Sequence, residues 1–112
     1  MVDLVEGAVV WMEFGPVRGR EQGGHRPAVV VSTQEYLDAV TTLAIVLPVT
    51  SRNRGWANHV ALTGRTGLSS PCWAMTEQPR TVARERILRV AGVVDDSCLV
   101  DVRLYLRDYF GL

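Results

Sequence analysis

Short apolar runs rich in valine recur along the chain, and glycine or proline separates most of them. The clearest are residues 7–14 (GAVVWMEF), 28–31 (AVVV) and 41–49 (TTLAIVLPV), with weaker runs at 58–63, 72–76 and 88–94. Such runs favour short strands, and an uninterrupted one such as 28–31 indicates burial on both faces. Strands about 10 to 15 residues apart, with few long helices, predict a small, strongly bent sheet or a partly open barrel.

Two segments predict helices instead. Residues 32–35 (STQE) have the spacing of a capping box, with a hydroxyl three residues before Glu35, and predict a short helix over 34–39. At the other end of the chain, apolar residues recur at steps of three and four, which predicts a helix that covers the sheet with one face. They are Leu99, Val102, Leu106, Tyr109 and Phe110.

The ends of this second helix are also predicted by residue type. Asp95 or Asp96 can cap its N-terminus, and Gly111 can end it.

The length of 112 residues fits one domain spanning residues 1–112, and a hydrophobic content of 47% allows a modest core. The longest apolar stretch, residues 43–49, is far shorter than the roughly 20 residues that a bilayer span needs. The first residues carry acids and no basic flank, unlike a signal peptide. We therefore expect no membrane partner and a cytoplasmic location.

The formal net charge of zero conceals an uneven distribution. All 12 basic residues are arginines, and residues 15–92 carry ten of them against five acids. The acidic excess lies in the first 14 and last 20 residues. Guanidinium groups suit bidentate contact with phosphate, so the middle of the chain is compatible with nucleic-acid binding. A GC-rich genome would equally explain the absence of lysine.

Metal chemistry has little support in the sequence. The two cysteines, Cys72 and Cys98, form no CxxC pair, and the two histidines, His25 and His59, are far apart. We expect buried free thiols, no metal site and no cofactor.

Three segments together resemble the MazF/PemK (Kid) family of toxins. They are residues 15–32 (GPVRGREQGGHRPAVVVS), residues 45–51 (IVLPVTS) and residues 77–82 (EQPRTV) followed by 85–88 (ERIL). The family shares a G-x-EQ-x-G-x-RP loop and strand, a V-P-x-TS strand end and an acid-Gln-x-Arg-Thr segment. The resemblance runs from Glu6 to the end of the chain, with all three segments in order.

The resemblance implies a mainly β (α+β) fold. In detail it implies a small SH3-like barrel of about five to seven short strands, with a short helix and a C-terminal helix, in a homodimer. It further implies a sequence-specific, metal-independent endoribonuclease acting on single-stranded RNA. The enzyme would be the toxin of a type II toxin–antitoxin system, neutralised by a cognate antitoxin whose tail covers the RNA groove.

The family's catalytic arginine corresponds to Arg26, at the start of a buried strand. Metal-free ribonucleases generally use the substrate's own 2′-hydroxyl, so a cation must stabilise the charged phosphorane. An arginine pKa above about 12 favours charge stabilisation over proton donation. Thr50, at a strand end, can hydrogen-bond a phosphate oxygen or orient the 2′-hydroxyl. Glu21 is the better general base on chemical grounds.

Several polar residues are candidates for RNA binding. They are Arg20, Ser51, Arg52, Asn53, Glu77, Gln78 and Arg80. Trp56 and Trp73 can stack on bases, although core or dimer-interface packing is the more common use of tryptophan, and this holds for Trp11 as well.

Two other functions stay open at this point. A non-catalytic poison of the same fold would act by binding DNA gyrase, but that branch lacks the Arg26 and Thr50 pair. An RNA-binding SH3-like module without toxicity would need neither residue.

Overall fold

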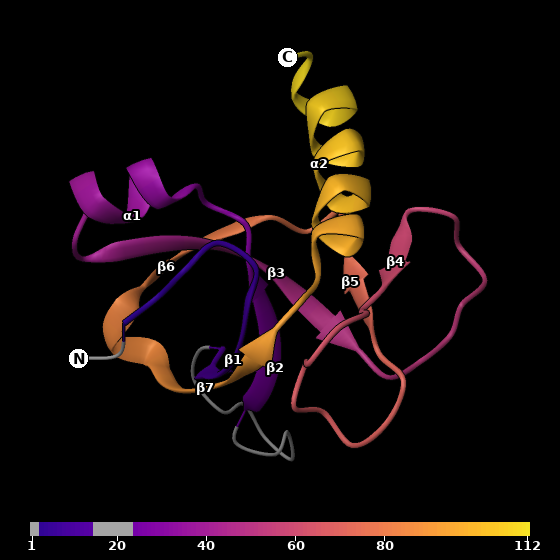
Figure 1. Ribbon diagram of the computed structural model, residues 1–112, viewed down its shortest axis with the longest axis horizontal. Coiled ribbons are helices and arrows are strands. Elements are labelled where there is room, and N and C mark those ends of the chain that lie inside the picture. Colours follow the sequence, from indigo (N-terminus) through magenta and orange to yellow (C-terminus); the bar gives the residue numbers. More distant parts are fainter. Residues whose placement is uncertain (1–2, 15–23) are drawn as a thin grey trace.

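The computed structural model describes residues 3–14 and 24–112 (Figure 1). In these residues seven strands, two α-helices and one 3-10 turn follow one another, which confirms the mainly β prediction. They are β1 (Ala8–Glu13), β2 (His25–Val30), α1 (Gln34–Ala39), β3 (Leu43–Thr50), β4 (His59–Ala61), β5 (Trp73–Met75), β6 (Arg80–Ala83), η1 (Arg84–Arg86), β7 (Ile87–Val93) and α2 (Asp96–Phe110).

β3 is the strand around which the sheet bends. The strand order is β4-β5-β3-β2-β1-β7, and β6 pairs with β3 off this path. β6 pairs with the first half of β3, from Leu43 to Val46, whereas β5 pairs with its end at Val49 and Thr50. Because two different strands share one edge of β3, the sheet turns away from a flat arrangement at that strand (Figure 1).

The middle of the sheet is covered on both faces. Ala28, Val29 and Val30 of β2 are each 0% exposed, which confirms the prediction of a strand buried on both faces. One core contains Val10, Met12, Val30 and Leu37, and the other contains Val9, Val29, Leu47 and Val102. Alternate side chains of one strand therefore enter different cores.

The edge strands β4 and β7 do not pair with each other within the described part of the chain, so the sheet is not closed. Two backbone hydrogen bonds bridge the gap. Val93 N–H donates to the Arg65 carbonyl and Asp95 N–H donates to the Thr63 carbonyl, both at 2.9 Å. The structure is thus the partly open barrel that the strand spacing predicts.

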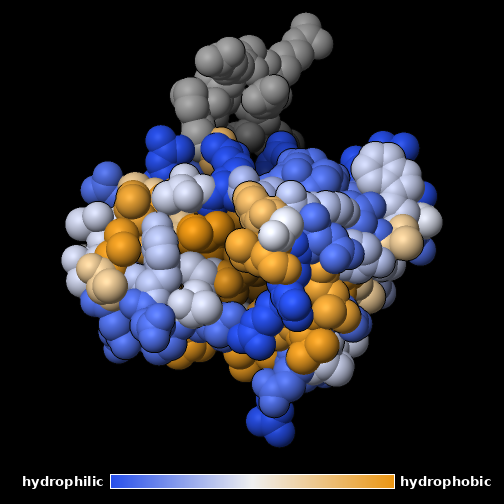
Figure 2. Space-filling view, turned by 90° about the horizontal axis from the view of Figure 1, so that it is seen from above, coloured by the Kyte–Doolittle hydropathy of each residue, from blue (hydrophilic) through white to orange (hydrophobic). Residues whose placement is uncertain are grey.

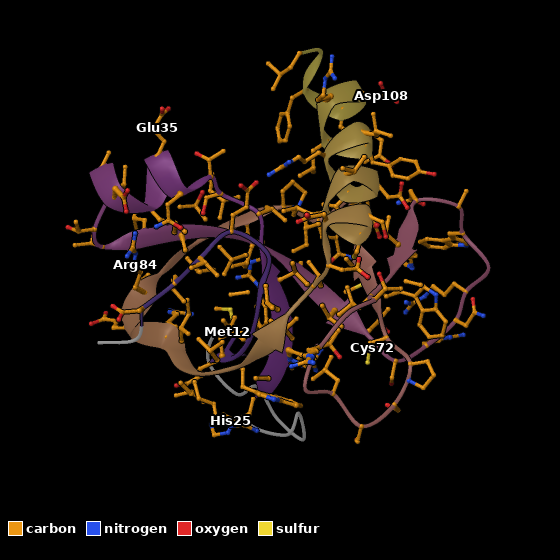
Figure 3. All side chains as sticks on the ribbon, viewed as in Figure 1. Met12, His25, Glu35, Cys72, Arg84 and Asp108 are labelled. Atoms are coloured by element: carbon orange, nitrogen blue, oxygen red, sulfur yellow. The ribbon has the colours of Figure 1, made fainter. Side chains whose placement is uncertain are left out.

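α1 spans the predicted residues, but a different residue caps it. Thr33 Oγ1 accepts the hydrogen bond from Tyr36 N–H at 3.1 Å. Ser32 is buried, and its Oγ accepts from Ile45 N–H of β3 at 3.2 Å. Glu35 points into solvent (Figure 3). The predicted Ser32–Glu35 capping box is therefore wrong, because the Ser32 hydroxyl satisfies a strand amide instead.

α2 is capped by Asp95, which accepts from Cys98 N–H at 3.0 Å, and Gly111 ends it in a left-handed conformation. Leu99 and Val102 are buried against the sheet as predicted, whereas Tyr109 and Phe110 are 50% and 60% exposed. The prediction that the whole apolar face covers the sheet is therefore wrong for the last turns, because α2 runs past the edge of the sheet (Figure 1).

Cys72 and Cys98 are buried free thiols, as predicted. Among the described residues, no helix is long and apolar enough to cross a membrane.

Candidate nucleic-acid interface

A cavity of about 370 Å³ lies where β1, β2 and β3 meet the segment that leads into β5. Its volume is within the usual range of small-molecule sites, about 300–1,000 Å³. It contains Arg26 and Thr50, the two residues that the sequence most strongly marks for catalysis. The lining consists of Trp11, Arg26, Pro27, Val49, Thr50, Ser51, Leu68, Ser69, Ser70 and Cys72.

The register of β2 against β3 explains why Arg26 and Thr50 share this cavity. Ala28 pairs with Pro48 in an antiparallel ladder, so continuing the register by two residues places Arg26 opposite Thr50. Side chains opposite each other on neighbouring strands are close neighbours. Arg26 is exposed and Thr50 is half-buried, so both side chains are accessible to a ligand.

The segment 64–71 forms one wall of the cavity and is held against β7 by a close backbone approach. A Cβ at Gly67 would lie 2.1 Å from the Ala91 carbonyl oxygen, and one at Gly92 would lie 2.1 Å from the Arg65 carbonyl oxygen. Both positions therefore require glycine. This contact positions Leu68, Ser69 and Ser70 along the cavity.

Trp11 forms another part of the wall. It lies between Pro27 of β2 and Arg89 of β7 in the ladder, and the Arg89 guanidinium is 5.5 Å from its ring centroid. Sequence reasoning favoured a packing role for Trp11. Because side chains alternate along β1, Trp11 lies on the face of the sheet that carries Val9. Only the tertiary structure shows that Trp11 lines the cavity beside its β2 partner Pro27.

The loop after Thr50 carries the next predicted RNA-binding residues. Ser51 lines the cavity, and Arg52 and Asn53 follow in an exposed loop. Thr50 Oγ1 accepts from Arg52 N–H at 3.1 Å, and Asn53 Oδ1 accepts from Gly55 N–H at 2.9 Å. These two local bonds fix the conformation of the loop that follows the cavity.

Glu77 and Gln78 lie in the turn between β5 and β6, outside the lining of the cavity. His59 Nε2 lies 3.0 and 3.1 Å from the two Glu77 carboxylate oxygens, and Asn58 Nδ2 donates to Oε1 at 3.0 Å. Gln78 Nε2 donates to Oε2 at 3.3 Å. Four contacts therefore already occupy the Glu77 carboxylate. The 18-residue separation of His59 and Glu77 offered no sequence signal for this pair.

Electrostatics at Glu77 follow from these contacts. Partial burial alone would raise the pKa of Glu77, but the hydrogen bond from His59, those from its own backbone and from Gln78, and the charge of His59 outweigh it. The pKa of Glu77 therefore lies below the ordinary value for a glutamate.

Arg80 is also separate from the cavity lining. Its guanidinium lies over the Phe14 ring, 5.0 Å from the centroid, at the end of β1. Phe14 is the last described residue before the segment 15–23 that carries Arg20 and Glu21, which lie outside the described residues.

A larger cavity of about 640 Å³ lies between β4 and α2. Its lining includes Asp101 and Asp108 and, among the described residues, no arginine. Two carboxylates repel a phosphate, so this cavity is a poor place for nucleic acid despite its size. The smaller cavity with Arg26 is the better candidate.

The Arg26 cavity can hold a phosphate between a guanidinium and hydroxyl groups. Arginine supplies a fixed positive charge with planar donors, and Thr50 and Ser51 supply hydroxyls. In the described part of the chain, no three His, Cys, Asp or Glu side chains gather as metal ligands. A bent, mainly β sheet with this cavity at its rim defines a small, partly open β barrel.

Comparison with known proteins identifies the family within this class. The model of the family described as PemK-like, MazF-like toxin of type II toxin-antitoxin system matches residues 6–110. The chain belongs to this family.

Three relatives illustrate the similarity. The chain is 38% identical to the endoribonuclease MazF9 of Mycobacterium tuberculosis over 95% of both sequences. It is 35% identical to the endoribonuclease toxin MazF of Escherichia coli, in an alignment that spans 69% of this chain and 66% of that protein. In the crystal structure of MazE-MazF from Deinococcus radiodurans, a chain 33% identical superimposes with a TM-score of 0.80, covering 97% of this chain and 96% of that one.

Proposed function

We propose that this toxin is a metal-independent endoribonuclease that cleaves single-stranded RNA. The observation that carries the proposal is the shared cavity of Arg26 and Thr50, which the family resemblance assigns to catalysis. The endoribonuclease names of its relatives in Escherichia coli and Mycobacterium tuberculosis support the same activity.

In the proposed reaction the 2′-oxygen of a ribose attacks the adjacent phosphorus. The new P–O2′ bond forms as the P–O5′ bond breaks, which leaves a 2′,3′-cyclic phosphate and a 5′-hydroxyl end. The Arg26 guanidinium stabilises the additional negative charge of the five-coordinate phosphorane. The Thr50 hydroxyl donates a hydrogen bond to a phosphate oxygen and so orients the phosphate for in-line attack.

The reaction needs a base for the 2′-hydroxyl proton and an acid for the departing 5′-oxygen. The cavity lining contains no carboxylate or imidazole in the described residues. We therefore keep Glu21 as the candidate base, since the carboxylate belongs to the segment that precedes Arg26 in the chain, and solvent water supplies the proton that the departing 5′-oxygen takes up.

RNA would extend from the cavity along the exposed loop of Ser51, Arg52 and Asn53, with Arg20 and Arg80 as candidate phosphate contacts. Between Glu77 and Gln78, the contacts favour Gln78 as the reader of a base edge. Its Nε2 is engaged by Glu77, which leaves its Oε1 oxygen to accept a hydrogen bond from a base. Glu77 then holds the turn in place.

A cognate antitoxin is the proposed protein partner. A relative 33% identical to this chain crystallised as a MazE-MazF complex, which supports the same kind of pairing here. The basic middle of the chain favours an antitoxin segment with acidic and apolar residues, which would compete with RNA for the Arg26 cavity.

Cleavage of a long RNA in the presence of EDTA tests this function. We expect fragments with 5′-hydroxyl ends from the wild type, and a rate about 100- to 1,000-fold lower for Arg26→Ala, the loss typical of removing a charge-stabilising group. Arg86→Ala, which removes an exposed arginine of η1 outside the cavity lining, is the matched control and should cleave normally.

Two results would contradict the proposal. One is intact RNA after incubation of the wild type with several diverse substrates. The other is an Arg26→Ala variant that cleaves as fast as Arg86→Ala.

A further inference from the structure

The chain has three tryptophans, all within the described residues, and only Trp11 lines the Arg26 cavity. Trp56 is 53% exposed and packs with Arg54 and His59 in the loop before β4. Trp73 lies in β5 and takes no part in the lining. The position of Trp11 therefore sets it apart from the others.

Trp11 occupies the place where the second core ends. Val9 of β1 and Val29 of β2 are fully buried in that core, and the next residues on the same face, Trp11 and Pro27, are only partly buried. Trp11 and Pro27 line the cavity together with Val49 from this face, and the lining also includes their strand neighbours Arg26 and Thr50. Val9 is fully covered, whereas the Trp11 ring is partly buried and forms part of the cavity wall.

Arg89 lies on the other side of the same ring. Trp11 pairs with Pro27 on one side and with Arg89 on the other, and the cavity includes Pro27 but not Arg89. The guanidinium, 5.5 Å from the ring centroid, therefore lies on the β7 side, and the cavity lies on the β2 side. The cation–π contact holds the indole in place and leaves its cavity side available.

We propose that Trp11 stacks on an unpaired base next to the phosphate held by Arg26 and Thr50. This inference rests on the proposed endoribonuclease function and adds a binding subsite to it. In single-stranded RNA every phosphate has a base on each side, and aromatic rings beside a cationic groove bind such bases by stacking. Because every base has a π-face, Trp11 contributes affinity and positioning rather than sequence choice.

The test uses a short single-stranded RNA that spans a cleavage site mapped with the wild type. A 2′-deoxyribose at the attacking nucleotide prevents cleavage, and a second set of RNAs lacks one base on either side of that phosphate. Dissociation constants are measured by fluorescence anisotropy of labelled RNA for the wild type, Trp11→Leu and Trp11→Phe.

We expect removal of one of these bases to weaken wild-type binding about tenfold or more, the size of one lost base stack. Trp11→Leu should bind the complete RNA about as weakly as the wild type binds the RNA that lacks the stacked base. Removing the same base should not weaken the binding of Trp11→Leu any further. Trp11→Phe keeps an aromatic ring and should retain most of the affinity. An equal loss on base removal in the wild type and in Trp11→Leu would overturn the proposal.

A second measurement does not depend on how well Trp11→Leu folds. In the double variant Trp56→Phe/Trp73→Phe, Trp11 is the single remaining tryptophan, and RNA binding should quench its fluorescence. If anisotropy shows that RNA binds but the Trp11 emission does not change, the stacking proposal is contradicted and the proposed endoribonuclease function is not. A wild type that neither cleaves nor binds any RNA would instead refute the proposed function, and the stacking subsite with it.

Discussion

The Thr50 hydroxyl connects the cavity to the loop that follows it. Its oxygen accepts from Arg52 N–H at 3.1 Å, so its own proton is free to point toward a bound phosphate. A residue with a hydroxyl satisfies both contacts, and an apolar residue of the same shape satisfies neither.

Thr50→Val and Thr50→Ser separate these contributions from side-chain volume. We expect Thr50→Val to lower the RNA cleavage rate about tenfold or more, because a donor to the phosphate is lost. Thr50→Ser keeps the hydroxyl and should stay within a few-fold of the wild type. Initial rates on one RNA measure both variants, and equal rates for Val and wild type would remove Thr50 from the mechanism.

The carboxylate of Glu77 makes the fold sensitive to acid. Its pKa is lowered in the folded protein, so the ionised form stabilises the fold at pH values above the pKa of the unfolded chain. As the pH falls through that value toward the lower folded pKa, this contribution disappears.

Glu77→Gln tests this link between pH and stability. We expect the free energy of unfolding of the wild type to fall more than that of Glu77→Gln between about pH 6 and pH 3. Urea unfolding at several pH values measures the difference. Parallel pH profiles for the two proteins would show that the ionisation of Glu77 does not stabilise the fold.

At the scale of elements, the close packing of the segment 64–71 against β7 holds one wall of the cavity in place. Gly67 and Gly55 both have positive φ, +74° and +71°, but a Cβ at Gly67 would collide with Ala91 whereas one at Gly55 would meet nothing within 4 Å. Replacing Gly55 or Gly67 by alanine therefore introduces the same backbone strain, but only the alanine at position 67 meets other atoms.

We expect Gly55→Ala to cost about 1–2 kcal/mol of stability, the price of a left-handed alanine. Gly67→Ala should cost a further 1–3 kcal/mol, roughly the penalty of forced overpacking. It should also weaken RNA binding, since the wall carrying Leu68 moves. Chemical denaturation gives both energies, and equal losses would mean that the segment shifts freely on β7.

At the scale of the whole molecule, a notable amount of apolar surface is left uncovered. The last turns of α2 expose Leu104, Tyr109 and Phe110 to at least half of their full extent, and hydrophobic patches alternate with polar ones on the face seen in Figure 2. A small domain buries a limited fraction of its surface, so a second copy is the natural cover for such residues.

We therefore predict a homodimer in solution. Light scattering should give about 25 kDa, twice the 12.4 kDa of one chain. Replacing Leu104 and Phe110 by serine should shift the mass toward the monomer if these turns contribute to the contact. A wild-type monomer at micromolar concentration would refute the dimer.

Much of the architecture follows from local sequence. Valine-rich runs specify strands, and Asp95 and Gly111 delimit α2, because each signal acts within a few residues. Ser32 shows the limit of such signals. Its spacing to Glu35 is that of a capping box, yet its hydroxyl bonds to Ile45, 13 residues away.

By itself, the sequence determined the order of elements, the two-sided burial of β2 and, through its motifs, Arg26 and Thr50 as the residues of interest. Only the tertiary structure decided which residues stand beside them. The β2–β3 register places Arg26 opposite Thr50, and the β1 ladder adds Trp11 to their cavity. The same folding places Glu77 against His59 and outside that cavity. The physical reason is that register and loop packing depend on contacts between residues far apart in the chain, which no local pattern encodes.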